Sequence, residues 1–236
     1  MGHSLHKALP IIILFVSCAV LVAGLSWWIG DDKTPEAAIT TEIAEEELET
    51  PLTPEQLPTY DVAMTNNNNP VAVLETNKGT VEIELFEDTM PITAGNFKKL
   101  VNEGYYDGIK FHRVIEGFMI QGGDPITKTA EILKYGTGGP GYGIPDEHIA
   151  GEYLTNVRGT ISMANNGQPN SGGSQFFINL VDNLGLDYDK QPLTSKHPVF
   201  GHVVKGMDVV DAIGQVDVNM NNLPLEDVVI TKATIR

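Results

Sequence analysis

The chain has 236 residues, enough for one sizeable domain with appendages, and carries a formal net charge of −16. An acidic chain without clustered lysine and arginine is a poor match for nucleic acid, because neutralising phosphates requires such clusters. The single cysteine, Cys18, lies in an apolar segment, so the chain can form neither an intrachain disulfide nor a cysteine-based metal site.

The first 30 residues contain a long apolar segment, Ala8–Ile29. As a helix this segment would span roughly 30 Å, the thickness of the hydrocarbon core of a membrane. Trp27 and Trp28 end the segment, where indole rings favour the membrane interface. We therefore expect residues 1–30 to form an uncleaved single-pass anchor in the cell membrane.

The charges around this segment predict its orientation. Lys7 precedes it and Asp31-Asp32 follow it, which leaves the N-terminus in the cytoplasm and the chain after residue 30 on the extracytoplasmic side. The alternative is a signal peptide cleaved near Val22-Ala23-Gly24, which would give a secreted protein. In both cases the rest of the chain is exported.

Residues 31–69 differ in composition from both neighbouring regions. They hold ten acidic residues against the single base Lys33, together with four prolines and the asparagine tract Asn66–Asn69. Such a composition buries too little apolar surface to offset the entropy lost on ordering. We interpret residues 31–69 as a solvated acidic linker.

Residues 70–236 show the pattern of a mainly β domain. Short β-prone runs outnumber helices, which is typical of a sandwich or barrel. The Gly-rich passage 126–156 is expected to be a surface loop that is functional or an insertion. The predicted strands are Val71–Thr76, Thr80–Phe86, Phe111–Ile115, Phe118–Gln121, Thr160–Ala164, Gln175–Leu180, Pro198–Val204 and Val228–Ile235, and the predicted helices are Pro91–Glu103 and Met207–Ile213.

The stretch 111–125 places a cation inside an otherwise apolar, strand-like run. Strand alternation puts Arg113 on the face opposite His112 and Val114. The same alternation pairs Met119 with Gln121. Because charged side chains are rarely buried without a partner or a function, this geometry predicts a guanidinium and an amide facing an apolar groove.

Four separated segments carry a more specific signal. They read F-H-R-V-I-E-G-F-M-I-Q-G-G-D (111–124), R-G-T-I-S-M-A-N (158–165), N-S-G-G-S-Q-F-F-I (170–178) and H-P-V-F-G-H-V-V-K-G-M-D-V-V (197–210). In this order and spacing they resemble the cyclophilin family of peptidyl-prolyl cis-trans isomerases. The resemblance covers residues 70–236 and implies a closed eight-stranded antiparallel β-barrel capped by two α-helices.

The resemblance also implies a role for each matching position. The catalytic arginine would be Arg113, with His112 beside it. The substrate-binding residues would be Phe118, Met119, Phe177 and Leu186 in a proline pocket, Gln121, Ala164, Asn165 and Gln175 along the substrate backbone, and His197 at the pocket rim. Without the resemblance, Arg113 would be an ordinary surface arginine, His112 a structural histidine and His197 a loop residue.

The sequence departs from the family pattern at three places. Gly185 stands where many eukaryotic members carry a tryptophan that contacts cyclosporin A. Cyclosporin A is therefore a possible ligand whose binding is disfavoured by the loss of this contact. The turn 166–169 is one residue longer than the commonest form. An insertion, Ile126–Tyr135, follows Asp124.

We expect a peptidyl-prolyl cis-trans isomerase that acts on proline-containing polypeptides among exported proteins. Arg113 would stabilise the twisted amide beside the apolar pocket, with no covalent intermediate, metal or cofactor. A binding module that uses the groove without turnover is the alternative, and a third hypothesis is a domain positioned by its tether within a larger envelope complex.

Asp146-Glu147-His148 could be mistaken for metal ligands, and we interpret these residues as a solvated loop.

Overall fold

The computed structural model describes residues 66–151, 153–191 and 196–236. The predicted anchor Ala8–Ile29 and the linker up to residue 65 lie outside the described residues. Within the described part, no helix is long and apolar enough to cross a membrane. The strands are β1 (Val71–Thr76), β2 (Gly79–Leu85), β3 (Arg113–Ile115), β4 (Met119–Gly122), β5 (Thr160–Met163), β6 (Phe176–Asn179), β7 (Val199–Lys205) and β8 (Ile230–Ile235), and the helices are α1 (Pro91–Asn102) and α2 (Met207–Gly214).

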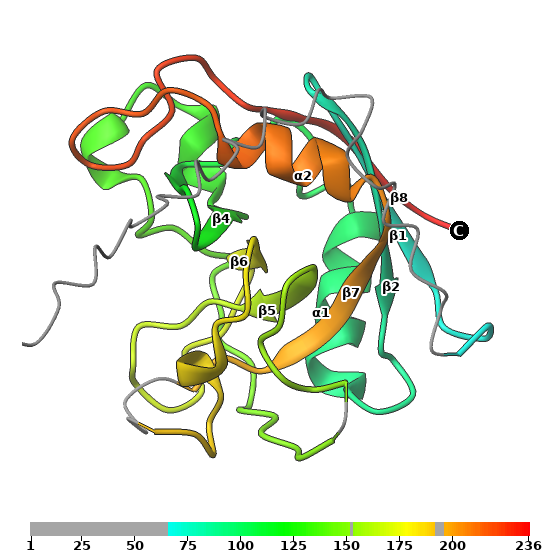
Figure 1. Cartoon of the computed structure of the whole chain (residues 1–236). Helices are drawn as coiled ribbons and strands as arrows, with labels where there is room; N and C mark the ends of the chain where they lie inside the picture. Colours follow the sequence, from blue (N-terminus) through cyan, green and yellow to red (C-terminus); the bar gives the residue numbers. More distant parts are fainter. Residues whose placement is uncertain (1–65, 152, 192–195) are drawn as a thin grey trace, which may run out of the picture. The chain divides into compact units, whose positions relative to one another are not determined.

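The eight strands form one antiparallel sheet in the order β3-β4-β6-β5-β7-β2-β1-β8. Figure 1 shows that this sheet curls around the domain core. The two outer strands of the ladder, β3 and β8, do not pair with each other. The predicted closed barrel is therefore corrected to a curled sheet that is open between β3 and β8. The two ends are joined instead where residues 108–111, which precede β3, hydrogen-bond to residues 228–230.

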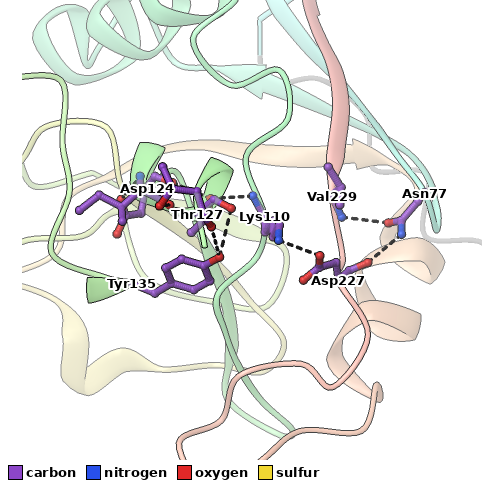
Figure 2. A network of polar contacts seen from close by, with 9 residues as sticks. Asn77, Lys110, Asp124, Thr127, Tyr135, Asp227 and Val229 are labelled. Carbon is purple, nitrogen blue, oxygen red and sulfur yellow. Dashed lines mark hydrogen bonds and ion pairs between the residues drawn. The ribbon is translucent and has the colours of Figure 1, made fainter. Parts of the chain in front are cut away.

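Lys110 lies where the chain before β3 meets the chain before β8, and we call this junction the seam. Lys110 forms an isolated antiparallel bridge with Val229, and its Nζ lies 2.7 Å from Asp227 Oδ2. Its backbone N–H donates to Thr127 Oγ1 at 3.0 Å. Figure 2 shows Lys110 between these two partners, with Asn77 contacting Asp227 and Val229 on the far side. The hydrogen bond to Asp227 raises the pKa of Lys110, so the ammonium group stays protonated beside this carboxylate.

The core lies inside the curled sheet and beneath the helices. Helix α1 packs against β7 and β8, and α2 packs against β2, β3 and β4. Phe97 of α1 meets Tyr106, Phe176 and Phe200 at ring-centroid distances of 4.8, 5.4 and 5.3 Å. Aromatic pairs at these distances add to the stabilisation from burial alone, so this cluster fixes α1 on the sheet.

Strand β2 departs from simple alternation at Glu84. Its neighbours Ile83 and Leu85 are core residues, yet Glu84 is also fully buried. The Glu84 carboxylate accepts hydrogen bonds from Asn66 N and Asn69 Nδ2, each at 2.9 Å. Two asparagines that the composition assigned to the linker are thus bound to the domain, because a buried carboxylate needs donors.

Glu147 is the capping residue of helix α1. Met90 at the N-cap provides no side-chain hydrogen bond, and Pro91 supplies no N–H. Instead, the Glu147 carboxylate accepts from Ile92 N at 3.0 Å and from Thr93 N at 2.7 Å. Glu147 is 6% exposed, so the prediction that it is a solvated loop residue was wrong. An anion at a helix N-terminus is favoured by the helix dipole.

Candidate active site

Met119 of β4 and Phe177 of β6 lie on the face of these strands that points away from the core, and we call this pair the apolar patch. Ile120 of β4 points into the core, so its neighbours Met119 and Gln121 share the opposite face. Phe177 of β6 pairs with Gln121 in register and therefore joins that face. Met119 and Phe177 are 2% and 4% exposed although neither belongs to the core cluster. The predicted pairing of Met119 with Gln121 is confirmed.

Arg113 stands at the edge of this patch. It is exposed and pairs with Gln121 across β3 and β4, whereas Val114 enters the core. Its Nη1 donates to Gln121 Oε1 at 3.4 Å, and Gln121 Nε2 donates to Gln175 Oε1 at 3.1 Å. A hydrogen-bonded row of one guanidinium and two amides therefore borders the apolar patch, and the guanidinium keeps donors free for a ligand.

His197 lies beside Phe177 and is hydrogen-bonded to the backbone of Leu186, and we call these two residues the second wall. The rings of Phe177 and His197 meet edge-on, with centroids 5.3 Å apart. His197 N donates to the Leu186 carbonyl at 3.0 Å, and His197 Nδ1 lies 3.0 Å from the Met163 carbonyl. Burial lowers the pKa of His197, against the opposing effect of the Met163 carbonyl. The neutral ring then donates from Nδ1 and leaves Nε2 as an acceptor.

Phe118 directly precedes β4 and is half-buried. Its carbonyl accepts from Leu180 N and from Asn183 Nδ2, both at 2.9 Å. These bonds fix the backbone from which Met119 also projects. Of the five apolar-site residues, Phe118 and Met119 lie on a chain segment that pairs with the strand of Phe177, and His197 is hydrogen-bonded to Leu186 and contacts the Phe177 ring.

A cleft of about 620 Å³ adjoins the patch. Four predicted residues line it, namely Gln121, Ala164, Asn165 and Gln175. Ala164 N donates to the Gln175 carbonyl at 3.0 Å, which joins the two sides of the cleft. The remaining walls come from residues 136–142 and from Asn166, Ser171, Gly173 and Ser174.

The glycine-rich segment 136–142 was not predicted as part of the site. Gln175 Nε2 donates to the carbonyls of Gly136 and Gly138 at 2.9 and 2.8 Å. The buried carboxylate of Asp124 accepts from Gly136 N and Gly138 N at 2.5 and 3.1 Å. The run of glycines was the available signal, since backbone groups can approach a ligand or a side chain closely only where no Cβ intervenes.

His112 does not share the face of Arg113. It is 7% exposed, and a Cβ at Gly136 would lie 3.6 Å from its Nε2. Among the described residues, neither ring nitrogen has a hydrogen-bond partner of good geometry. Burial lowers the pKa of His112 despite the nearby Asp124 carboxylate. The structure thus places His112 on the face opposite Arg113, and its catalytic role stays a prediction.

No group of three His, Cys, Asp or Glu residues that could hold a metal ion occurs in the described parts of the chain. In the segment Asp146-Glu147-His148, Glu147 caps α1, and the His148 ring stacks on Tyr188 with centroids 5.4 Å apart. These side chains therefore have structural partners of their own.

A family model described as "Cyclophilin type peptidyl-prolyl cis-trans isomerase/CLD" matches residues 71–235. A peptidyl-prolyl cis-trans isomerase of Acinetobacter baylyi is 39% identical over 172 residues, which cover 71% of this chain and 86% of the relative. The mouse peptidyl-prolyl cis-trans isomerase-like 1 is 39% identical over 168 residues, covering 70% and 91%.

Solved structures agree with these relatives. A cyclophilin-type peptidyl-prolyl cis-trans isomerase of Cryptosporidium parvum matches with a TM-score of 0.57 and 30% identity, over 71% of this chain and 97% of that chain. A second structure of that protein, in the presence of the dipeptide Ala-Pro, matches with a TM-score of 0.57 and 29% identity, over 70% and 98%. The chain belongs to the cyclophilin-type peptidyl-prolyl cis-trans isomerase family. It is accordingly an enzyme that isomerises peptide bonds preceding proline.

Proposed function

We propose that the domain accelerates rotation about X-Pro bonds because Arg113 stabilises the twisted amide beside the apolar patch. The observation that carries this proposal is the placement of one exposed guanidinium on the strand face shared by Gln121, Met119 and Phe177. Its contact with Gln121 at 3.4 Å is long, so the guanidinium can turn toward a bound peptide at small cost.

The chemistry requires neither a nucleophile nor a cofactor. The barrier to rotation of a peptide bond is about 18–20 kcal/mol, since the nitrogen lone pair is delocalised into the carbonyl. In the twisted state the proline nitrogen becomes pyramidal and its lone pair can accept a hydrogen bond. An arginine is always protonated and carries a fork of donors, so it interacts more strongly with this state than with either planar state.

The other site residues hold the peptide on both sides of the bond that turns. Phe118, Met119, Phe177, Leu186 and His197 offer an apolar enclosure for the proline ring. Gln121, Ala164, Asn165 and Gln175 line the cleft next to it and offer polar groups to the peptide backbone. A rate increase of about 10⁵ requires about 7 kcal/mol, which preorganised hydrogen bonds in a partly desolvated site can supply.

The test replaces Arg113 and compares it with a matched arginine. Arg236 is likewise exposed and is paired with Glu82 on the β1–β8 side of the sheet. In a protease-coupled assay with an X-Pro peptide, Arg113→Ala should lower kcat/KM by about 10²–10³ through kcat, whereas Arg236→Ala should remain near wild type. Circular dichroism controls for folding. A folded Arg113→Ala protein with nearly full activity would remove the mechanism, and wild-type binding without acceleration would leave only a binding module.

We propose further that the enzyme acts on exported proteins from a membrane-tethered position. This proposal rests on the apolar segment Ala8–Ile29 and on the acidic composition of residues 31–69. The mass of the mature protein extracted from membranes tests it. An intact N-terminus supports the anchor, and loss of about the first two dozen residues would show a cleaved signal peptide instead.

A further inference from the structure

A group of buried polar side chains lies beside the apolar patch on the same strand face, and the proposed mechanism does not use it. Asn156, Ser162 and Asn179 are fully buried, and Asp187 is 4% exposed. Burying an amide or a carboxylate is costly unless its donors and acceptors are paired. All four side chains are hydrogen-bonded, so the informative question is which parts of the site they connect.

The first connection is to the wall that contains Leu186 and His197. Asn156 Nδ2 donates to the His197 carbonyl at 3.1 Å and to Asp187 Oδ1 at 2.7 Å. Because the carbonyl and the carboxylate only accept, both N–H groups of the Asn156 amide are committed. Asp187 directly follows Leu186 in the chain, so one amide holds both ends of this wall.

The second connection runs to Phe118. Asn156 Oδ1 accepts from Asn179 Nδ2 at 3.2 Å, and Asn179 Oδ1 accepts from Asn183 Nδ2 at 2.8 Å. Asn183 Nδ2 also donates to the Phe118 carbonyl at 2.9 Å. Three amides are therefore joined oxygen to nitrogen, with the His197 carbonyl at one end and the Phe118 carbonyl at the other.

We propose that Asn156, Asn179 and Asn183, the asparagine relay, are positioning residues that set the separation between the two walls of the proline pocket. The walls are carried by β4 and by the chain at residues 186 and 197, which the sheet does not pair with β4. The relay connects them along the strand face that carries the patch, since Asn179 pairs in register with Met119. This inference rests on the proposed function, since it assigns the pocket to proline.

The relay is most easily cut at Asn183, which is half-buried. Asn183→Ala removes the donors to Phe118 and to Asn179, and the isosteric Asn183→Asp removes the same donors while keeping the side-chain volume. Because the pocket walls contact the ring in the planar and twisted states alike, we expect KM for an X-Pro peptide to rise about tenfold with kcat nearly unchanged.

Asn69→Ala is the matched control. Like the Asn183 variants it removes an asparagine amide that donates a hydrogen bond, here from the buried Asn69 to Glu84 of β2, outside the candidate site. Its thermal stability should fall by a similar amount, and its KM should stay within about twofold of wild type, as expected for a change that touches only stability. If the Asn183 variants change KM no more than Asn69→Ala does, the proposal is overturned.

A second measurement does not depend on turnover. Methyl-labelled methionine gives seven resonances at most, and the Met119 methyl reports directly on the patch. We expect both Asn183 variants to shift the Met119 resonance and Asn69→Ala to leave it in place. A wild-type protein without isomerase activity would refute the proposed function, while the Met119 resonance would still decide the relay. An unshifted Met119 in both folded Asn183 variants would refute the relay.

Discussion

Replacing Glu147 tests how the long loop before β5 stabilises helix α1. The carboxylate is 6% exposed and accepts from Ile92 N at 3.0 Å and Thr93 N at 2.7 Å. Glu147→Ala leaves both donors without this partner. Asp146→Asn, at the exposed neighbouring position, is the matched control because its side chain does not reach the helix.

The expected loss follows from the two hydrogen bonds. A bond to a charged group contributes about 1.5–3 kcal/mol, and the loss at the buried Thr93 should lie in that range. Ile92 is exposed, so water replaces part of its bond and the loss there is about 0.5–1 kcal/mol. With about 0.5 kcal/mol from the helix dipole, the total is about 3 kcal/mol, or a fall in Tm of about 6–12 °C.

Urea unfolding followed by circular dichroism measures this loss, and hydrogen exchange at the amides of Ile92 and Thr93 localises it. Glu147→Gln keeps one acceptor without the charge and should lose about half as much as Glu147→Ala. Asp146→Asn should change the free energy of unfolding by less than about 0.5 kcal/mol. Equal stability of Glu147→Ala and Asp146→Asn would refute the assignment of Glu147 as the cap of α1.

Three further predictions concern pH, glycine and macrocycle binding. Burial lowers the pKa of three histidines in the folded protein. As the pH falls, these side chains therefore bind protons in the unfolded chain before they do so in the folded protein. The free energy of unfolding should be largest above about pH 6.5 and should decrease toward pH 5. A free energy of unfolding that does not change with pH in urea titrations would contradict this. These histidines are His112, His197 and His202. Gly123→Ala should lose about 2–4 kcal/mol, because φ is +91° and the new Cβ would lie 2.2 Å from the Ser174 carbonyl oxygen. Gly117→Ala, at φ +67° with open space around it, should lose only about 1 kcal/mol, and equal losses would exclude the steric argument. Cyclosporin A should inhibit the wild type weakly, and Gly185→Trp should lower the inhibition constant by about tenfold, whereas unchanged inhibition would show that this position is not a determinant.

Local patterns in the sequence were enough to locate the eight strands and two α-helices found in the described residues. Alternation in β2 and the Pro91 start of α1 depend only on nearby residues, so their predicted bounds agree with the structure to within about two residues. Alternation also placed Arg113 opposite Val114 and Met119 beside Gln121. The motifs themselves identified the family that the comparisons show.

The gap between β3 and β8 could not be predicted from these patterns, and the expected closed barrel was wrong at this point. What joins the two ends of the sheet includes contacts of Lys110 with Asp227 and Val229, which lie in a distant part of the chain. The burial of Glu84 could not be predicted either, because its donors Asn66 and Asn69 lie in a tract whose composition is typical of a linker. Glu147 was misjudged for the same reason, since its partners are backbone N–H groups of a helix far away in the chain.

The amino-acid sequence by itself determined the order of the elements, the family and the positions of the guanidinium and the apolar side chains. These depend on side-chain chemistry and on the two-residue period of a strand. Only the tertiary structure decided that residues 136–142 line the cleft and that three asparagines connect Phe118 to His197. Both arrangements are made by hydrogen bonds between segments distant in sequence, and the partners of such bonds are set by how the chain folds back on itself.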